Sequence, residues 1–159
     1  MNKRAIIKKI TAKLADELEV YFRAAQFARA EATHEQNKAE HKYDTRGLEA
    51  SYLARGQSRQ AAELEAAIAE FEKLDGRPLA EDQGIGLGAL VELEHGGEKT
   101  WYFLGPRAGG TEVIHDKREI LIITPQSPLG GQLMGKKTGD RPLLNFGGAK
   151  QPALVVSVI

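Results

Sequence analysis

Cysteine is absent from this sequence of 159 residues. Its absence excludes a disulfide-bonded scaffold, a thiolate metal site and a thiol nucleophile, and it suits a reducing compartment. An excess of charge is missing too, because 22 Lys and Arg residues are balanced by 22 Asp and Glu residues. The overall charge therefore gives no indication of a nucleic-acid or membrane partner.

Long hydrophobic runs are also missing. No stretch approaches the roughly 18 apolar residues that a membrane-spanning helix needs. The N-terminus is basic, but Lys8 and Lys9 interrupt what would be the apolar centre of a signal peptide. We therefore expect a cytoplasmic protein without a membrane partner.

The first half of the sequence has helical periodicity. From about residue 4 to the mid-thirties there is no proline or glycine, and apolar residues recur every three or four positions. This stripe consists of Ile7, Ile10, Leu14, Leu18, Tyr21, Ala25, Ala28 and Ala32. A second helix is expected from about residue 45 to 74, with N-cap chemistry at Asp44 and Thr45. Its stripe consists of Ala50, Leu53, Gln57, Ala61, Leu64, Ile68 and Phe71.

The two predicted helices have similar lengths, and a short polar stretch, NKAEHKYD, separates them at residues 37–44. We call residues 37–44 the tip segment. These features favour an antiparallel hairpin within one chain over the alternative, a coiled coil that joins two chains. Folding the helices together places Ala28 near Gly56, so close approach of the helices is one reason for this glycine and a bend in the helix is the other.

After Leu74 the sequence changes character. Residues 76–83 contain glycine, proline and charged residues and are predicted to be a linker. Short runs typical of strands follow at residues 89–94, 99–104, 112–115, 119–124, 143–146 and 153–159. One short helix is expected between Ser127, which can cap it, and Gly135, which can end it. The prediction is an α+β fold with a helical finger at 1–75 and a small sheet domain at 84–159.

Residues 127–140, SPLGGQLMGKKTGD, carry a resemblance to a known family. This stretch is similar to the C-terminal signature of the bacterial Gre transcript-cleavage factors. The matching residues are Ser127, Pro128, Leu133, Gly135, Lys136 and Asp140. The entry strand at residues 88–91 and the terminal strand also resemble that domain. The resemblance covers nearly the whole chain, and it implies an N-terminal antiparallel coiled-coil hairpin followed by a small FKBP-like domain.

The resemblance implies a transcription elongation factor that binds RNA polymerase at the rim of its secondary channel, with Ser127, Pro128, Leu133, Gly135 and Lys136 in the docking surface. The tip segment would reach the active centre, near the 3′ end of the nascent RNA. Two acidic residues there would help to hold the second catalytic Mg²⁺ ion, and the polymerase itself would hydrolyse backtracked RNA. The protein would then be no enzyme and would have no cofactor of its own, only Mg²⁺ shared with the polymerase.

Two carboxylates of the tip segment are the candidates for this role. The first acid of the family's tip falls on Glu40, and the second falls on Tyr43, so that Asp44 is the nearest acid and Glu35 is held in reserve. Asp44 can also cap the second helix. A metal site made by His34, Glu40 and His41 is disfavoured by the spacing of these residues.

Basic residues surround the tip. Lys38, Lys42 and Arg46 are candidates for contact with RNA phosphates or with acidic walls of the channel. Arg29, Arg55 and Arg59 belong to the same set, and for each of them the alternative is an ordinary solvated helix surface.

Two other functions remain open from the sequence. The protein can occupy the secondary channel as a regulator or inhibitor without promoting cleavage, as the altered spacing of the tip acids suggests. It can also be a chaperone or prolyl isomerase, because the second domain resembles the FKBP fold, although the few aromatic residues there disfavour an isomerase pocket. We expect a monomer.

Overall fold

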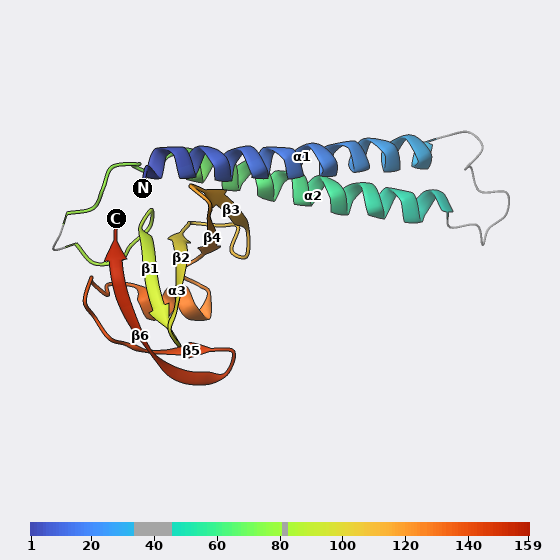
Figure 1. Ribbon diagram of the computed structural model, residues 1–159. Helices are drawn as coiled ribbons and strands as arrows, with labels where there is room; N and C mark the ends of the chain where they lie inside the picture. Colours follow the sequence, from blue (N-terminus) through green and yellow to red (C-terminus); the bar gives the residue numbers. More distant parts are fainter. Residues whose placement is uncertain (34–45, 81–82) are drawn as a thin grey trace. The chain divides into compact units, whose positions relative to one another are not determined.

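The computed structural model describes residues 1–33, 46–80 and 83–159. The fold is α+β, with two long helices followed by a mixed sheet of six strands (Figure 1). By its contacts the chain divides into two units. One consists of Met1–Thr11 together with Ala69–Ile159, and the other of Ala12–Ile68. None of the helices in the described ranges is long and apolar enough to cross a bilayer.

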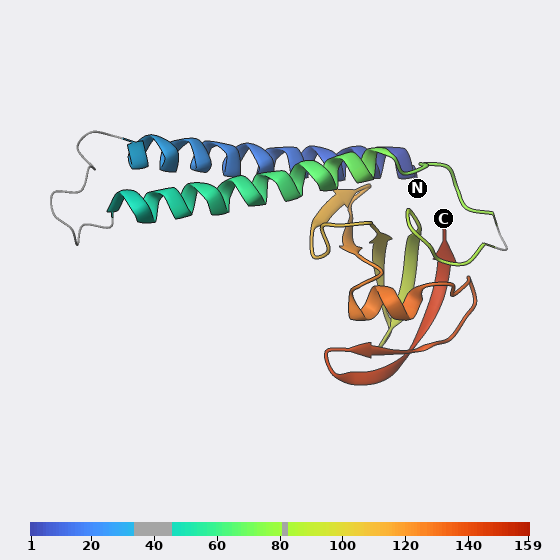
Figure 2. The same ribbon diagram turned by 180° about the vertical axis from the view of Figure 1, so that it is seen from behind.

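Helices α1 (Lys3–Thr33) and α2 (Arg46–Glu72) lie side by side within the unit Ala12–Ile68, as both views show (Figures 1 and 2). They run antiparallel, because later residues of α1 meet earlier residues of α2. Phe22 lines a groove together with Glu65, and Thr33 lines another together with Ser51.

The stripe predicted for α1 is confirmed at five of its eight positions. Leu18 and Tyr21 are only partly buried, and the side chain of Ala32 lies outside the described residues. Ile7, Ile10, Leu14, Ala25 and Ala28 are all buried. These residues recur at helical spacing and give α1 a single apolar face.

The stripe predicted for α2 is only partly correct. Ala61 and Phe71 are buried as expected, but Leu53 is 55% exposed, whereas its neighbour Ala54 is only 4% exposed. Adjacent positions fit the helical period almost equally well, so the period alone does not choose between them. The buried side chains of the helix pair in this region are alanines, and the larger leucine points away.

The prediction that Gly56 allows close approach of the two helices is wrong. A Cβ atom added at Gly56 would meet no atom within 4 Å. Gly56 is an exposed residue inside α2 with ordinary helical neighbours. Packing against α1 therefore does not require a glycine here.

Replacing Gly56 with alanine is accordingly expected to stabilise the protein. The gain is about 0.5–1 kcal/mol in the free energy of unfolding, because alanine loses less backbone entropy in a helix. Chemical denaturation of the full chain measures it. The matched control is Ala62→Gly at another exposed position of α2, which should lose a similar amount. A loss of stability in Gly56→Ala would show that a bend at this position is needed.

The six strands of the sheet confirm the strand prediction. They are β1 (Leu90–His95), β2 (Glu98–Leu104), β3 (Glu112–His115), β4 (Arg118–Ile123), β5 (Leu143–Phe146) and β6 (Ala149–Val158). Their order in the sheet is β3-β4-β2-β1-β6-β5. Strands β2 and β4 are parallel and all other neighbours are antiparallel, so the sheet is mixed.

Strand β6 begins earlier than predicted. It starts at Ala149, directly after a turn in which Gly147 and Gly148 both have positive φ angles. Pro152 lies within the strand, although proline usually interrupts a sheet. Pro152 pairs with Leu143 of β5, and the pairing of β6 with β1 begins one residue later, at Ala153. Pro152 is tolerated because it lies before the part of β6 that pairs with β1.

The short helix α3 (Pro128–Leu133) covers one face of the sheet. It lies behind β1 and β2 in Figure 1 and in front of them in Figure 2. Leu133 is fully buried in a core that includes Val91, Tyr102, Leu104 and Val155. The helix is thus fixed on the sheet by its apolar side.

Both edges of the sheet receive a side-chain contact. Lys9 Nζ donates to the carbonyl oxygen of Ile114 in β3 at 2.7 Å, and the Asn145 N–H of β5 donates to Gln132 Oε1 at 2.9 Å. Such contacts take up edge groups that could otherwise pair with another chain.

The start of α1 is anchored by a buried lysine. Lys3 is 2% exposed, and its Nζ donates to the carbonyl oxygen of Gly88 at 3.1 Å. Burial lowers the pKa of Lys3, and the nearby carboxylate of Asp75 opposes this shift.

Candidate functional site

The predicted site residues fall into two groups. Glu40, Asp44, Lys38 and Lys42 lie outside the described residues, as do Glu35, His34 and His41. Arg46 is the first residue of α2. The remaining five, Ser127, Pro128, Leu133, Gly135 and Lys136, come together in one stretch of the sheet unit. We call residues 127–140 the signature segment.

Ser127 caps α3, as predicted. It has extended backbone angles, with φ −71° and ψ 151°, and its Oγ accepts a hydrogen bond from the Gly130 N–H at 3.1 Å. The same hydroxyl donates to the carbonyl oxygen of Thr124 at 2.7 Å. Pro128 follows in the first turn, where the missing N–H costs nothing. The Ser-Pro pair therefore ties the start of α3 to the end of β4.

Gly130 is a site residue that the sequence analysis missed. A Cβ atom there would lie 2.0 Å from the carbonyl oxygen of Thr124 and 2.9 Å from Ser127 Oγ. Only glycine lets the first turn of α3 approach the end of β4 this closely. The next residue, Gly131, is exposed and would place a Cβ 3.1 Å from the oxygen of Pro125.

The signature segment has a buried side and an exposed side. Leu133 is fully buried and Leu129 packs against the same core, so these residues position the segment rather than present a surface. Pro128, Gly131 and Met134 are exposed, and Met134 is 43% exposed although it is apolar. The exposed side is the part that a partner can contact.

The end of α3 pairs with the strand-like entry to the sheet. The Gly135 N–H donates to the Ile85 carbonyl oxygen, and the Ile85 N–H donates to the Lys136 carbonyl oxygen, both at 2.8 Å. Gly135 has φ +75°, a conformation that favours glycine, and this confirms its predicted place at the helix end. Gly84 is also required, because a Cβ there would lie 2.7 Å from the oxygen of Gly135.

The last part of the signature segment is a tight turn. Asp140 Oδ2 accepts from the Lys137 N–H at 2.8 Å, and Gly139 has φ +90°. The Gly139 N–H donates to the oxygen of Val155, and the Val155 N–H donates to the oxygen of Asp140. Strand β6 therefore holds the turn in place, so the segment is fixed at both ends.

A second feature lies on the helix pair. A groove of about 400 Å³ between α1 and α2 is lined by Arg29, Thr33, Ser51, Ala54, Arg55 and Ser58. Arg29 Nη2 donates to Ser58 Oγ at 3.0 Å, and the Arg55 guanidinium lies 5.7 Å from the centre of the Tyr52 ring. Among the described residues, the lining has two cations, three hydroxyl groups and no acidic side chain, a combination that suits an anionic group. Arg29 and Arg55 were named from the sequence, but the sequence did not predict that they share a groove.

No metal site is formed within residues 1–33, 46–80 and 83–159, where no three His, Asp or Glu side chains gather closely enough.

No family model matches the chain, and no curated protein matches it. Solved structures do match: Gfh1, the GreA factor homolog 1 of Thermus thermophilus, is 26% identical, with 94% of each chain covered and a TM-score of 0.38. This chain resembles the Gre-type transcription factors. The resemblance expected from the sequence is to the same group of proteins that these matches name.

Two further structures belong to the same group. Gfh1 of Thermus aquaticus is 26% identical, with 92% of each chain covered and a TM-score of 0.41. The transcription elongation factor GreA/GreB of Nitrosomonas europaea is 19% identical, covers 74% of this chain and 94% of its own, and has a TM-score of 0.37.

Proposed function

We propose that this protein is a Gre-like transcription elongation factor. It binds RNA polymerase at the secondary channel and stimulates the polymerase's intrinsic cleavage of backtracked RNA. The observation that carries the proposal is the signature segment. Its residues match the family's motif, and hydrogen bonds to Thr124, to Ile85 and to Val155 of β6 hold them in one partly exposed surface.

The signature segment is the docking surface in this proposal. Pro128 and Met134 offer exposed apolar contacts, and Lys136, two residues after Met134, adds a partly exposed cation. Ser127 and Leu133 act by position, because one caps α3 and the other fastens it to the core. A rigid surface binds with little loss of conformational entropy, which favours affinity.

The helix pair forms the coiled-coil finger and the sheet unit the FKBP-like domain. At the tip segment, Glu40 and Asp44 supply carboxylate oxygens, which Mg²⁺ prefers as ligands. The ion is shared with the polymerase active site, where two metal ions activate water and steady the leaving oxygen. The catalyst remains the polymerase, and this protein is an accessory factor without a resident cofactor.

Basic side chains complete the finger. Lys38, Lys42 and Arg46 meet RNA phosphates or acidic channel walls. The groove with Arg29 and Arg55 on the helix pair offers a further positively charged contact. Such contacts weaken as salt rises, because they release counterions.

A second candidate function rests on the spacing of the tip acids. Tyr43 stands where the second acid falls in the family, and Asp44 is the next residue. If this shift prevents the two carboxylates from sharing one ion, the protein occupies the channel as a regulator and does not promote cleavage.

The deciding experiment is an RNA cleavage assay on a stalled, backtracked polymerase complex with Mg²⁺, with and without this protein. Faster cleavage supports the elongation factor. Unchanged cleavage together with protection against a cleavage-competent factor supports the channel-occupying regulator. If the protein neither accelerates cleavage nor competes for the polymerase, both candidates are wrong.

A further inference from the structure

A second surface of the sheet unit has no part in the proposed function. A shallow hollow of about 520 Å³ is lined by residues of β1, β2, β3 and β4, among them Glu92, Lys99, Trp101, Glu112, Arg118 and Glu119. Trp101 is the only tryptophan of the chain, and it is partly exposed. A large aromatic side chain that remains partly open on a surface is a typical anchor for a partner.

The Trp101 ring already receives a planar cation. The guanidinium carbon of Arg118 in β4 lies 5.5 Å from the centre of the ring. This distance is within the range of about 6 Å over which a cation and an aromatic face attract one another. The surroundings of the ring therefore accept a guanidinium group.

Glu92 is the neighbour of Trp101 on the adjacent strand, and its ion pair with Lys99 is weak. It lies directly opposite Trp101 in the pairing of β1 with β2, so their side chains share one face of the sheet. Its side chain is only 17% exposed, yet Lys99 Nζ is 3.9 Å from its Oε1 and belongs to a side chain that is 53% exposed. An ion pair of this length with a solvated lysine contributes little. A largely buried carboxylate gains more from a close, bidentate partner.

We propose that Glu92 and Trp101 form a receptor for an arginine side chain that a protein partner presents. The guanidinium lies against the Trp101 ring and donates N–H bonds to the Glu92 carboxylate. Arginine fits better than lysine, because its planar fork both stacks on an aromatic ring and bonds a carboxylate through two N–H groups. The lining has three glutamates and two cations, so its net charge complements a cationic side chain.

The single tryptophan makes this proposal directly measurable. The full chain is titrated with the blocked peptide acetyl-Gly-Arg-Gly-amide at constant ionic strength, and the fluorescence of Trp101 is recorded. We expect a saturable change. The equally charged acetyl-Gly-Lys-Gly-amide should bind several-fold more weakly, because it lacks the planar fork. The absence of a saturable change with the arginine peptide overturns the proposal.

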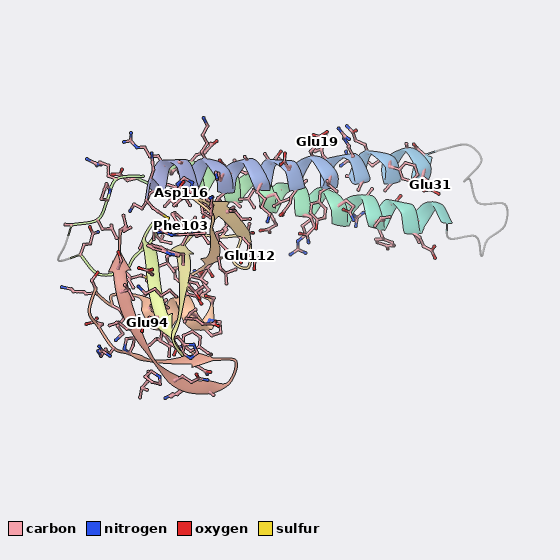
Figure 3. The ribbon with its side chains drawn as sticks, in the orientation of Figure 1. Glu19, Glu31, Glu94, Phe103, Glu112 and Asp116 are labelled. Atoms are coloured by element: carbon pink, nitrogen blue, oxygen red, sulfur yellow. The ribbon has the colours of Figure 1, made fainter. Side chains whose placement is uncertain are left out.

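Three variants test the assignment of residues. Glu92→Gln should weaken binding of the arginine peptide about tenfold, because a charge-assisted hydrogen bond is lost. Glu94→Gln is the matched control. Glu94 is on the same strand, β1 (labelled in Figure 3), but does not line the hollow, so removing its charge should leave binding unchanged. Lys99→Gln should tighten binding, because it removes the ion that competes for Glu92.

Thermal unfolding of each variant establishes that the sheet is intact. Equal effects of Glu92→Gln and Glu94→Gln would mean that the peptide responds only to overall charge, and the proposal would then be wrong. Tighter binding in Lys99→Gln with weaker binding in Glu92→Gln is the pattern that supports it.

Discussion

Replacing Gly130 with alanine is expected to lower the free energy of unfolding by about 3 kcal/mol or more. The added Cβ would lie 2.0 Å from the oxygen of Thr124 and 2.8 Å from its carbonyl carbon, and both are backbone atoms with little room to move. Overpacking of this kind costs about 1–3 kcal/mol. Displacing the first turn also breaks the hydrogen bonds of Ser127, which adds about 1 kcal/mol for the lost cap.

Thermal unfolding of the full chain measures this loss, and the midpoint should fall by roughly 10 °C. The matched control is Gly131→Ala, one residue further along α3. Its Cβ meets only the oxygen of Pro125, at 3.1 Å, and alanine gains about 1 kcal/mol of helix propensity, so the net change should be small. Equal losses for the two variants would show that the close approach at Gly130 is not what fixes α3.

The same pair of variants tests the docking surface. Since α3 carries the exposed side chains of the signature segment, displacing it should weaken polymerase binding by about tenfold or more, which corresponds to about 1.4 kcal/mol for each factor of ten. Gly131→Ala adds a methyl group to the exposed side without moving the helix. If the segment docks as proposed, Gly130→Ala loses affinity even at temperatures where it is fully folded.

The elements of this fold were predictable from the sequence because their signals are local. The stripe from Ile7 to Ala28, the Ser127-Pro128 cap and the Gly135 helix end each depend on neighbours within a few residues. The turn between β1 and β2 is a further example, because the glycine pair Gly96-Gly97 is a local turn signal and both residues have positive φ angles.

What escaped prediction depends on contacts between distant residues. Two successive glycines lower the helix propensity of α3. Gly130 is explained only by the nearby Thr124 oxygen, which is not evident from the sequence. The pairing of residues 84–85 with residues 135–136 has no local signal either. The Asp116-Lys117 turn between β3 and β4 has positive φ at both residues without any glycine, and so gave no turn signal of the usual kind.

The candidate site likewise has residues that local sequence signals identify and features that depend on distant contacts. The sequence could name Ser127, Pro128 and Gly135, because a motif lists them. It could not separate their roles, since Leu133 belongs to the same motif and is fully buried. Nor could it bring Arg29 and Arg55 into one groove, because that depends on the register of α1 against α2.

Replacing both Glu40 and Asp44 with alanine is expected to abolish stimulated RNA cleavage and to leave polymerase binding intact. The proposed role of these carboxylates is to hold the second Mg²⁺ ion, and without it the two-metal reaction loses one of its ions. In the proposed function, binding depends instead on the signature segment. Cleavage of backtracked RNA and competition for polymerase binding are measured on the same preparations, and raising the Mg²⁺ concentration should restore part of the rate.

The charge-matched control is the pair Glu31→Ala and Glu49→Ala. Glu31 lies near the end of α1 (Figure 3) and Glu49 in the first turn of α2, so this variant also removes two negative charges from the helix pair. It should cleave at the rate of the unaltered protein. Retained cleavage in the Glu40 and Asp44 variant would remove the assignment of these two residues.

The single variant Asp44→Ser separates the two roles that the sequence allows for Asp44. Serine caps a helix about as well as aspartate, but it offers no carboxylate to Mg²⁺. If Asp44 is a ligand, cleavage falls while the thermal midpoint stays unchanged. If Asp44 only caps α2, the cleavage rate and the thermal midpoint both stay unchanged in Asp44→Ser. The variant Asp44→Ala, which removes the cap, then lowers the midpoint. In that case Glu40 would have to recruit the ion without Asp44, or the protein would be the channel-occupying regulator.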